Sequence, residues 1–89
     1  MPKYRIVVHR KVDKFLERLD EKTRRRVLED ILCLENFPEF NKDLDIVKMQ
    51  GYKNLYRLRT DQLRTMFTVD KTTATIIILK IAQREAAYE

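Results

Sequence analysis

The chain has 89 residues, of which 37% are charged, and its 19 lysines and arginines against 14 aspartates and glutamates give a formal net charge of +5. This length supports a single domain, residues 1–89, with one hydrophobic core and no need of disulfides or metals for folding. Basic domains of this size favour polyanions or acidic protein partners.

The rarer residue types exclude several kinds of chemistry. One cysteine cannot form an intramolecular disulfide or a thiol cluster, and one histidine without a Cys, His or carboxylate cluster around it does not make a metal centre. One glycine rules out a glycine-rich phosphate loop, and the absence of serine removes a serine-type triad. The sequence therefore predicts neither a metal site nor a cofactor.

Hydropathy gives no sign of a membrane protein. No apolar run approaches the roughly 20 residues that a membrane span needs. The chain begins Met1-Pro2-Lys3-Tyr4, without a signal-peptide hydrophobic region. We therefore expect a cytoplasmic protein that does not bind membranes.

The first half of the chain predicts a strand and a helical hairpin. Residues 4–9 are β-branched and partly alternating, which is typical of a strand. Apolar residues at helical spacing then predict a helix ending near Leu19, and Asp20 is a suitable N-cap for a second helix that must end before Pro38. The apolar residues of the two helices are Val12, Phe15, Leu16 and Leu19, then Val27, Leu28, Ile31, Leu32 and Leu34.

The second half predicts strands. Residues 45–49 alternate, and Gly51 supplies a positive φ angle after them. A hairpin follows over residues 54–67, then a turn at 70–73, a largely buried strand at 74–81 and a short tail at 82–88. The fold class is therefore α+β: an N-terminal strand, a two-helix hairpin, and antiparallel strands in a sheet with both helices packed on one face. The opposite face is expected to be open.

The predicted hairpin concentrates arginines on the open face. Strand alternation places Arg57 and Arg59 on the same face, and a two-residue turn at Asp61-Gln62 would bring Arg64 opposite Arg59. Like charges directly opposed across strands are destabilising, so the arrangement predicts an anionic ligand. Arginine forks match phosphate oxygens and would stabilise a phosphodiester attacked by its neighbouring 2′-hydroxyl, which makes RNA the expected substrate.

Nearly the whole chain resembles the RelE/ParE toxin superfamily, and in particular its archaeal RelE-type members. The resemblance lies in the order of the elements and in four segments of sequence. They are Val47-Lys48-Met49-Gln50-Gly51, Tyr56-Arg57-Leu58-Arg59, Leu63-Arg64 with Phe67-Thr68-Val69, and Leu79-Lys80-Ile81-Ala82-Gln83-Arg84 with Tyr88.

The resemblance implies the toxin of a type II toxin–antitoxin system, an RNA-binding, ribosome-dependent endoribonuclease (mRNA interferase) that cuts mRNA in the decoding site and inhibits translation. The implied partners are a RelB-like antitoxin and the ribosome with its mRNA. The resemblance also implies that toxin and antitoxin assemble as a heterotetramer. Carried over by position, the implied catalytic residues are Arg59, Arg64, Arg84 and Tyr88, and the substrate-binding residues are Lys48 and Arg57.

Two questions stay open at the level of sequence. Arginine is effectively never deprotonated, so the general base is either Tyr88, with a pKa lowered by the arginines, or Glu85. The alternative functions are a ParE-like toxin that acts by binding DNA gyrase and a relative that binds without catalysis. Helix lysines and arginines that could dock on ribosomal RNA are interleaved with acidic residues, so a merely solvated helix face explains them equally well.

Overall fold

The computed structural model describes residues 3–39 and 44–83. The elements follow the predicted order, and the α+β fold class is confirmed. They are β1 (Arg5–Val8), α1 (Arg10–Glu17), α2 (Glu21–Cys33), the 3₁₀ turn η1 (Leu34–Asn36), β2 (Asp45–Lys48), β3 (Leu55–Thr60), β4 (Leu63–Asp70) and β5 (Thr75–Gln83).

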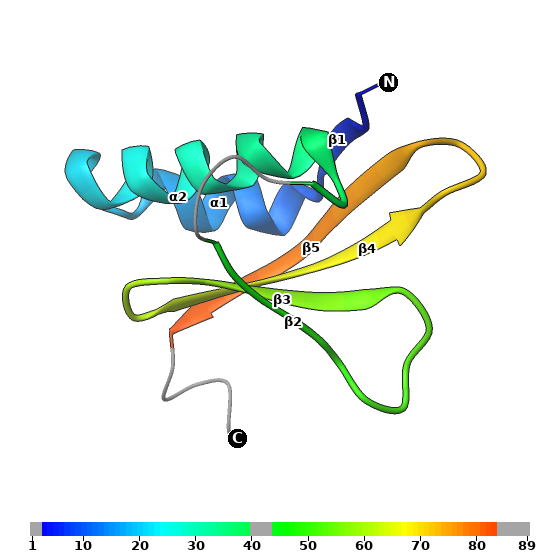
Figure 1. The fold of residues 1–89 in the computed structure, drawn as a ribbon. Helices are drawn as coiled ribbons and strands as arrows, with labels where there is room; N and C mark the ends of the chain where they lie inside the picture. The colour runs from blue at the N-terminus through cyan, green and yellow to red at the C-terminus, as the bar shows by residue number, and fades with distance from the viewer. Residues whose placement is uncertain (1–2, 40–43, 84–89) are drawn as a thin grey trace.

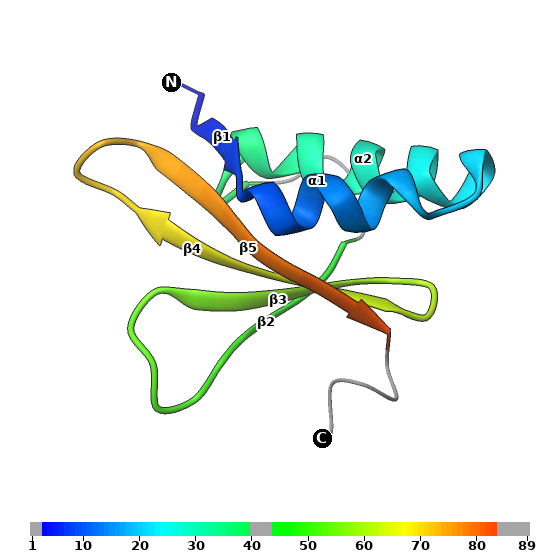
Figure 2. The same cartoon turned by 180° about the vertical axis from the view of Figure 1, so that it is seen from behind.

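The strands form one sheet in the order β1-β5-β4-β3-β2. β1 pairs with β5 in parallel, and every other pair is antiparallel. Both helices lie over the same face of this sheet, as Figure 1 and the reverse view in Figure 2 show. Within residues 3–39 and 44–83, no helix covers the other face, which we call the open face.

Local capping explains where the helices begin. The carboxylate of Asp20 accepts a hydrogen bond of 3.1 Å from the Thr23 backbone N–H, so the predicted N-cap of α2 is confirmed. At the start of α1, the imidazole Nδ1 of His9 accepts from the Lys11 N–H at 3.1 Å. The only histidine of the sequence therefore has a structural task.

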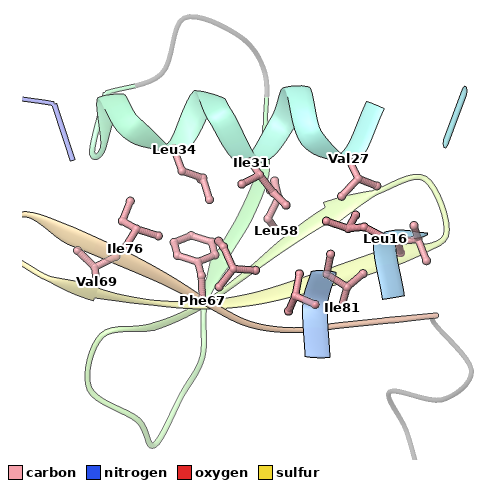
Figure 3. Close-up of a cluster of buried hydrophobic side chains, with 12 residues drawn as sticks. Leu16, Val27, Ile31, Leu34, Leu58, Phe67, Val69, Ile76 and Ile81 are labelled. Atoms are coloured by element: carbon pink, nitrogen blue, oxygen red, sulfur yellow. The ribbon is translucent and has the colours of Figure 1, made fainter. Parts of the chain in front are cut away.

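The core lies between the helices and the sheet, with Phe67 of β4 near its centre (Figure 3). The Phe67 ring is fully buried and stacks on Tyr56, with ring centroids 5.4 Å apart. Edge-to-face contacts continue from Tyr56 to Phe37 and from Phe37 to Tyr4, which ties β3 to the segment after α2 and to the residue before β1. The other buried apolar residues are Val12, Leu16, Val27, Ile31, Leu34, Leu58, Leu63, Val69, Ile76, Ile78 and Ile81.

One expectation needs correction, and the helical spacing of the second helix does not by itself show which apolar residues are buried. The last strand does not end at residue 81: Ala82 and Gln83 pair with Arg64 and Leu63, because β5 follows β4 along its whole length. The rest of the expected tail, residues 84–88, lies outside the described residues. Of the five apolar residues spaced along the second helix, Leu28 and Leu32 do not enter the core but are 38% and 60% exposed. They flank the inward stripe that Val27 and Ile31 form.

Candidate functional site

The β3–β4 hairpin brings two arginines face to face. The turn contains Asp61 and Gln62, and Arg59 pairs directly with Arg64 in the register, so the predicted two-residue turn is confirmed. Asp61 has a φ of 53°, a left-handed conformation that aspartate tolerates better than most residues. Residues directly opposite in an antiparallel pair have Cβ atoms about 4.5–5.5 Å apart. The two side chains therefore leave the backbone as neighbours.

The strand registers arrange these arginines in two rows across the open face. One row runs from Asp45 on β2 through Arg59 and Arg64 to Ala82 on β5. The next row consists of Val47, Arg57, Met66 and Lys80. Four cations thus lie within two adjacent rows, with Asp45 as the one carboxylate among them. An anionic ligand on this surface would meet a concentrated positive field.

The arginines differ in their contacts. An oxygen of Asp45 lies 3.6 Å from Nη2 of Arg57, whose side chain is only 21% exposed. The Nε of Arg57 is buried and has no hydrogen-bond acceptor within the described part of the chain. A buried donor without an acceptor is unfavourable, so the position of Arg57 on this face lowers the stability of the fold. Arg59 is more exposed, and its Nε donates to the backbone oxygen of Asp61 at 3.3 Å.

Helix α2 holds the hairpin from the other side. Nη1 of Arg26 lies 2.8 Å from Oδ2 of Asp61, and the Thr60 hydroxyl donates to Oδ2 of Asp30 at 2.7 Å. These contacts surround a hollow of about 260 Å³, lined by Arg26, Glu29, Asp30, Arg59, Thr60 and Asp61. Because Asp61 carries both the Arg26 ion pair and the bond to Arg59, α2 fixes the end of the hairpin at which the arginine pair stands.

Three of the site residues predicted from the sequence lie on one face of the sheet, and a fourth, Lys48, lies on the opposite face. Arg57, Arg59 and Arg64 share the open face, as expected. Lys48 is exposed at the end of β2 and pairs with Tyr56. Because side chains alternate between the two faces of a strand, Lys48 lies on the face that the helices cover. The remaining assigned residues, Arg84 and Tyr88, lie outside the described residues, as does Glu85.

Sequence reasoning missed the parts played by Lys80 and Asp45. The signal for Asp45 was available, because it lies two residues before Val47 on the same strand face. Lys80 could not be placed by counting, because the pairing between β4 and β5 shifts by one residue at this point.

Among the lysines and arginines of the helices, Arg24 does not extend into solvent but contacts the backbone. It is half-buried, and its Nη1 lies 3.4 Å from the backbone oxygen of Leu19 and 3.5 Å from that of Leu16. Arg24 therefore binds the carboxyl end of α1, where the helix dipole favours a positive charge.

Among the residues that the structure describes, Asp20 and Asp70 have a pKa lowered by hydrogen bonding, and both lie away from the arginines. The Thr23 side chain and then its backbone N–H lower the pKa of Asp20. The side chains of Thr72 and then Thr73 lower the pKa of Asp70 in the turn between β4 and β5. These donors stabilise the charged carboxylates and so lower their pKa values. The Asp20 carboxylate caps α2, and the Asp70 carboxylate holds the turn after β4.

Residues 3–39 and 44–83 contain neither a metal-binding cluster nor a membrane-spanning helix. Their His, Cys, Asp and Glu residues include no group of three or more arranged to hold a metal ion. Their helices include none long and apolar enough to cross a membrane.

Comparison with known proteins assigns the family. No family model matches the chain. A protein assigned as toxin RelE1 of Methanocaldococcus jannaschii is 31% identical over 87 residues, which cover 98% of this chain and 97% of that protein. Identity at this level over the full length places the chain in the RelE toxin family.

Solved structures agree with this assignment. The crystal structure of the archaeal RelE–RelB complex from Pyrococcus horikoshii matches with a TM-score of 0.80 and 33% identity, over 92% of this chain and 96% of that one. A RelB–RelE complex from Methanococcus jannaschii matches with a TM-score of 0.76 and 28% identity, over 92% and 94%. The isolated RelE toxin of E. coli has a TM-score of 0.73 at 12% identity, over 90% and 83%, and shares the fold.

Proposed function

We propose that this chain is the toxin of a type II toxin–antitoxin system and acts as a metal-independent endoribonuclease that cuts mRNA on the ribosome. The observation that carries the proposal is the directly opposed pair Arg59 and Arg64, flanked by Arg57 on the open face of a RelE-family fold. A sheet selected for stability alone would avoid opposed like charges. A phosphodiester supplies the negative charge that makes the arrangement favourable.

The reaction that suits these residues is transesterification within RNA. The 2′-oxygen attacks the adjacent phosphorus, the bond from phosphorus to the 5′-oxygen breaks, and a 2′,3′-cyclic phosphate and a 5′-hydroxyl result. A general base takes the 2′-proton, and the leaving 5′-oxygen receives a proton. Negative charge grows on the phosphate oxygens during attack, and guanidiniums fixed on a rigid sheet stabilise it.

In this proposal the arginines bind and stabilise, and the proton moves elsewhere. Arginine stays protonated, so Arg57, Arg59 and Arg64 do not act as the base. The base remains Tyr88 or Glu85, and Arg84 joins the phosphate-binding set, as the family resemblance implies. Lys48 has its side chain on the helix-covered face of β2, so its assignment as a substrate-binding residue rests on the family resemblance alone.

The proposed protein partner is a RelB-like antitoxin. RelE members from P. horikoshii and M. jannaschii are found in complexes with RelB. An inhibitor of the proposed site would place acidic groups on the arginines of the open face and apolar groups on neighbours such as Val47, which is 44% exposed. We expect a heterotetramer of toxin and antitoxin. A ribosome-directed activity also requires the protein to work in the cytoplasm.

Translation of a defined mRNA in a reconstituted system tests the proposal, with cleavage sites mapped by primer extension. The wild-type protein should cut within codons only when ribosomes are present. Arg64→Ala should slow cleavage on the order of 10²- to 10³-fold, the typical effect of removing one preorganised transition-state donor. Lys71→Ala is the control, because Lys71 is an exposed cation in the turn between β4 and β5, outside both helices, and its loss should leave cleavage unchanged.

Intact mRNA and normal translation with the wild-type protein would contradict the proposal. Inhibition of DNA gyrase supercoiling by the same preparation would then support the ParE-like alternative. Ribosome binding without cleavage would instead indicate the non-catalytic relative.

A further inference from the structure

Strand β5 contains a β-bulge opposite Met66 and Phe67 of β4. Along β4, Val69 pairs with Ile76, and Phe67 pairs with Ile78, in regular antiparallel order. The next residue of β4, Met66, pairs with Lys80, so Leu79 is the extra residue on the β5 side. Bulges of this kind change which face the following side chains occupy, and they are frequent beside functional sites.

The bulge moves Lys80 from one face of the sheet to the other. Simple alternation would place Lys80 with Ile76 and Ile78, both of which are fully buried under the helices. After the bulge it is Ile81, 5% exposed, that continues the core, and Lys80 is exposed on the open face. A lysine at the buried parity would require burial of its ammonium group, which is very unfavourable without a partner.

The new position brings Lys80 to the arginines. Lys80 and Arg57 lie on either side of Met66 in one row. Arg64 is two residues before Met66, so it is the diagonal neighbour of both cations, at about 7–8 Å. Long side chains reach across such diagonals. Arg64 therefore stands at the centre of a cationic set, with Arg59 directly opposite and Lys80 completing the far side.

Two ordinary explanations of a lysine on a sheet bear on Lys80. Lysines on edge strands discourage pairing with other chains, and β1 pairs with β5 only up to Ile78, so within the described residues Lys80 has a strand neighbour on the β4 side alone. A lysine that served only this purpose would not contribute to RNA binding, which the experiment below tests. Lysines also form ion pairs across strands, but Lys80 has no carboxylate partner within residues 3–39 and 44–83. Its directly opposite neighbour on β4 is Met66.

We infer that Lys80 is a further substrate-binding residue, which contacts an RNA phosphate next to the one that Arg59 and Arg64 bind. This inference rests on the proposed function, because it names a further contact for the same RNA substrate. The β5 bulge is the structural device that delivers the ammonium group to that surface. A lysine acts here as a compact point charge on the phosphate backbone, independent of base sequence.

The test is equilibrium binding of a short labelled single-stranded RNA across a range of salt concentrations, with no ribosome present. Lys80→Met should weaken binding roughly tenfold, the loss expected for one charge-assisted contact. It should also reduce the slope of log K against log salt by about 0.7, the value for one phosphate contact on a single strand. Lys80→Arg should restore both quantities because it keeps the charge.

Lys71→Met is the matched control, because Lys71 is exposed in the turn between β4 and β5 and should change neither quantity. Lys80→Met binding with the wild-type affinity and slope would overturn the inference, and so would a wild-type protein that does not bind RNA. Thermal unfolding checks that each variant is folded. Failure of the proposed function has a different signature: the wild-type protein would bind RNA with a Lys80-dependent slope yet leave ribosome-bound mRNA intact.

Discussion

The two faces of β4 differ in burial and in charge, although their residues alternate along one strand. Towards the helices, Leu63, Thr65, Phe67 and Val69 are all buried. Towards the open side, Arg64, Met66 and Thr68 are each partly exposed. The apolar members of the first set, Leu63, Phe67 and Val69, stabilise the domain by removing apolar surface from water, at about 25 cal/mol per Å². The second set places a cation opposite another cation, which does not stabilise the sheet.

In this small domain, the residues that stabilise the fold and the residues of the candidate site occupy opposite faces of the same strand. The strand period of two allows one face to be selected for packing and the other for charge, without one constraining the other. Figure 3 shows the packed side, where Val27 and Ile31 of α2 and Leu34 of η1 approach Phe67 and Leu58 of the sheet. The comparison predicts that substitutions of neighbouring residues on opposite faces have unequal, and in places opposite, effects.

The largest contrast should come from adjacent residues of β4. Phe67→Ala should reduce the free energy of unfolding by about 3–5 kcal/mol, because the ring is fully buried and the cavity cannot refill. That loss is comparable to the whole stability of many small domains. Met66→Ala, on the open face, should cost much less. Urea denaturation monitored by circular dichroism measures both, and equal losses would contradict the division between the faces.

An intermediate effect should separate two threonines that both lie on the helix-covered face. Thr60→Val should cost about 1–3 kcal/mol, because the Thr60 hydroxyl donates to the Asp30 carboxylate. Thr65→Val should stabilise by about 1 kcal/mol, because the Thr65 hydroxyl is fully buried and has no hydrogen-bond partner within the described residues. Denaturant midpoints of the two variants should move in opposite directions. A common direction would show that hydrogen bonding does not decide their effect.

The smallest effect should appear at acid pH. The pKa of Asp20 and that of Asp70 are lowered in the folded state, so their contribution to stability is present above the unfolded pKa of about 3.9 and is lost as pH falls through the lower, folded pKa. Asp20→Asn keeps a good N-cap but does not titrate. Unfolding measured between neutral and acid pH should therefore depend less on pH in this variant. An unchanged dependence would exclude Asp20 as a contributor.

Much of the fold follows from sequence because its signals are local. The Asp20 cap, the positive φ at Gly51 and the two-residue turn at Asp61 each depend on a few neighbouring residues, and all three are confirmed. The family resemblance is also confirmed by a relative of 31% identity. The pairing of β5 with both β1 and β4 is long-range, and alternation along one strand does not specify it.

The sequence predicted the candidate site correctly where side chains alternate regularly between the two faces of a strand. It failed where a β-bulge interrupts this alternation. Arg57, Arg59 and Arg64 belong to an uninterrupted hairpin, so counting placed them correctly on one face. Lys80 follows a bulge, and no local pattern distinguishes Leu79 as the extra residue. The roles of Arg84 and Tyr88, and those of the other assigned residues, stay predictions.

A double-mutant cycle on Arg59 and Arg64, read out by both unfolding and cleavage, tests the central claim most directly. Arg59→Thr, Arg64→Thr and the double variant isolate the interaction between the pair, whatever other contacts each side chain makes. We predict a repulsive coupling of about 0.2–1 kcal/mol that weakens with added salt, together with strongly reduced mRNA cleavage in each single variant. An attractive coupling with unchanged cleavage would contradict the claim that the open face is maintained for an anionic substrate.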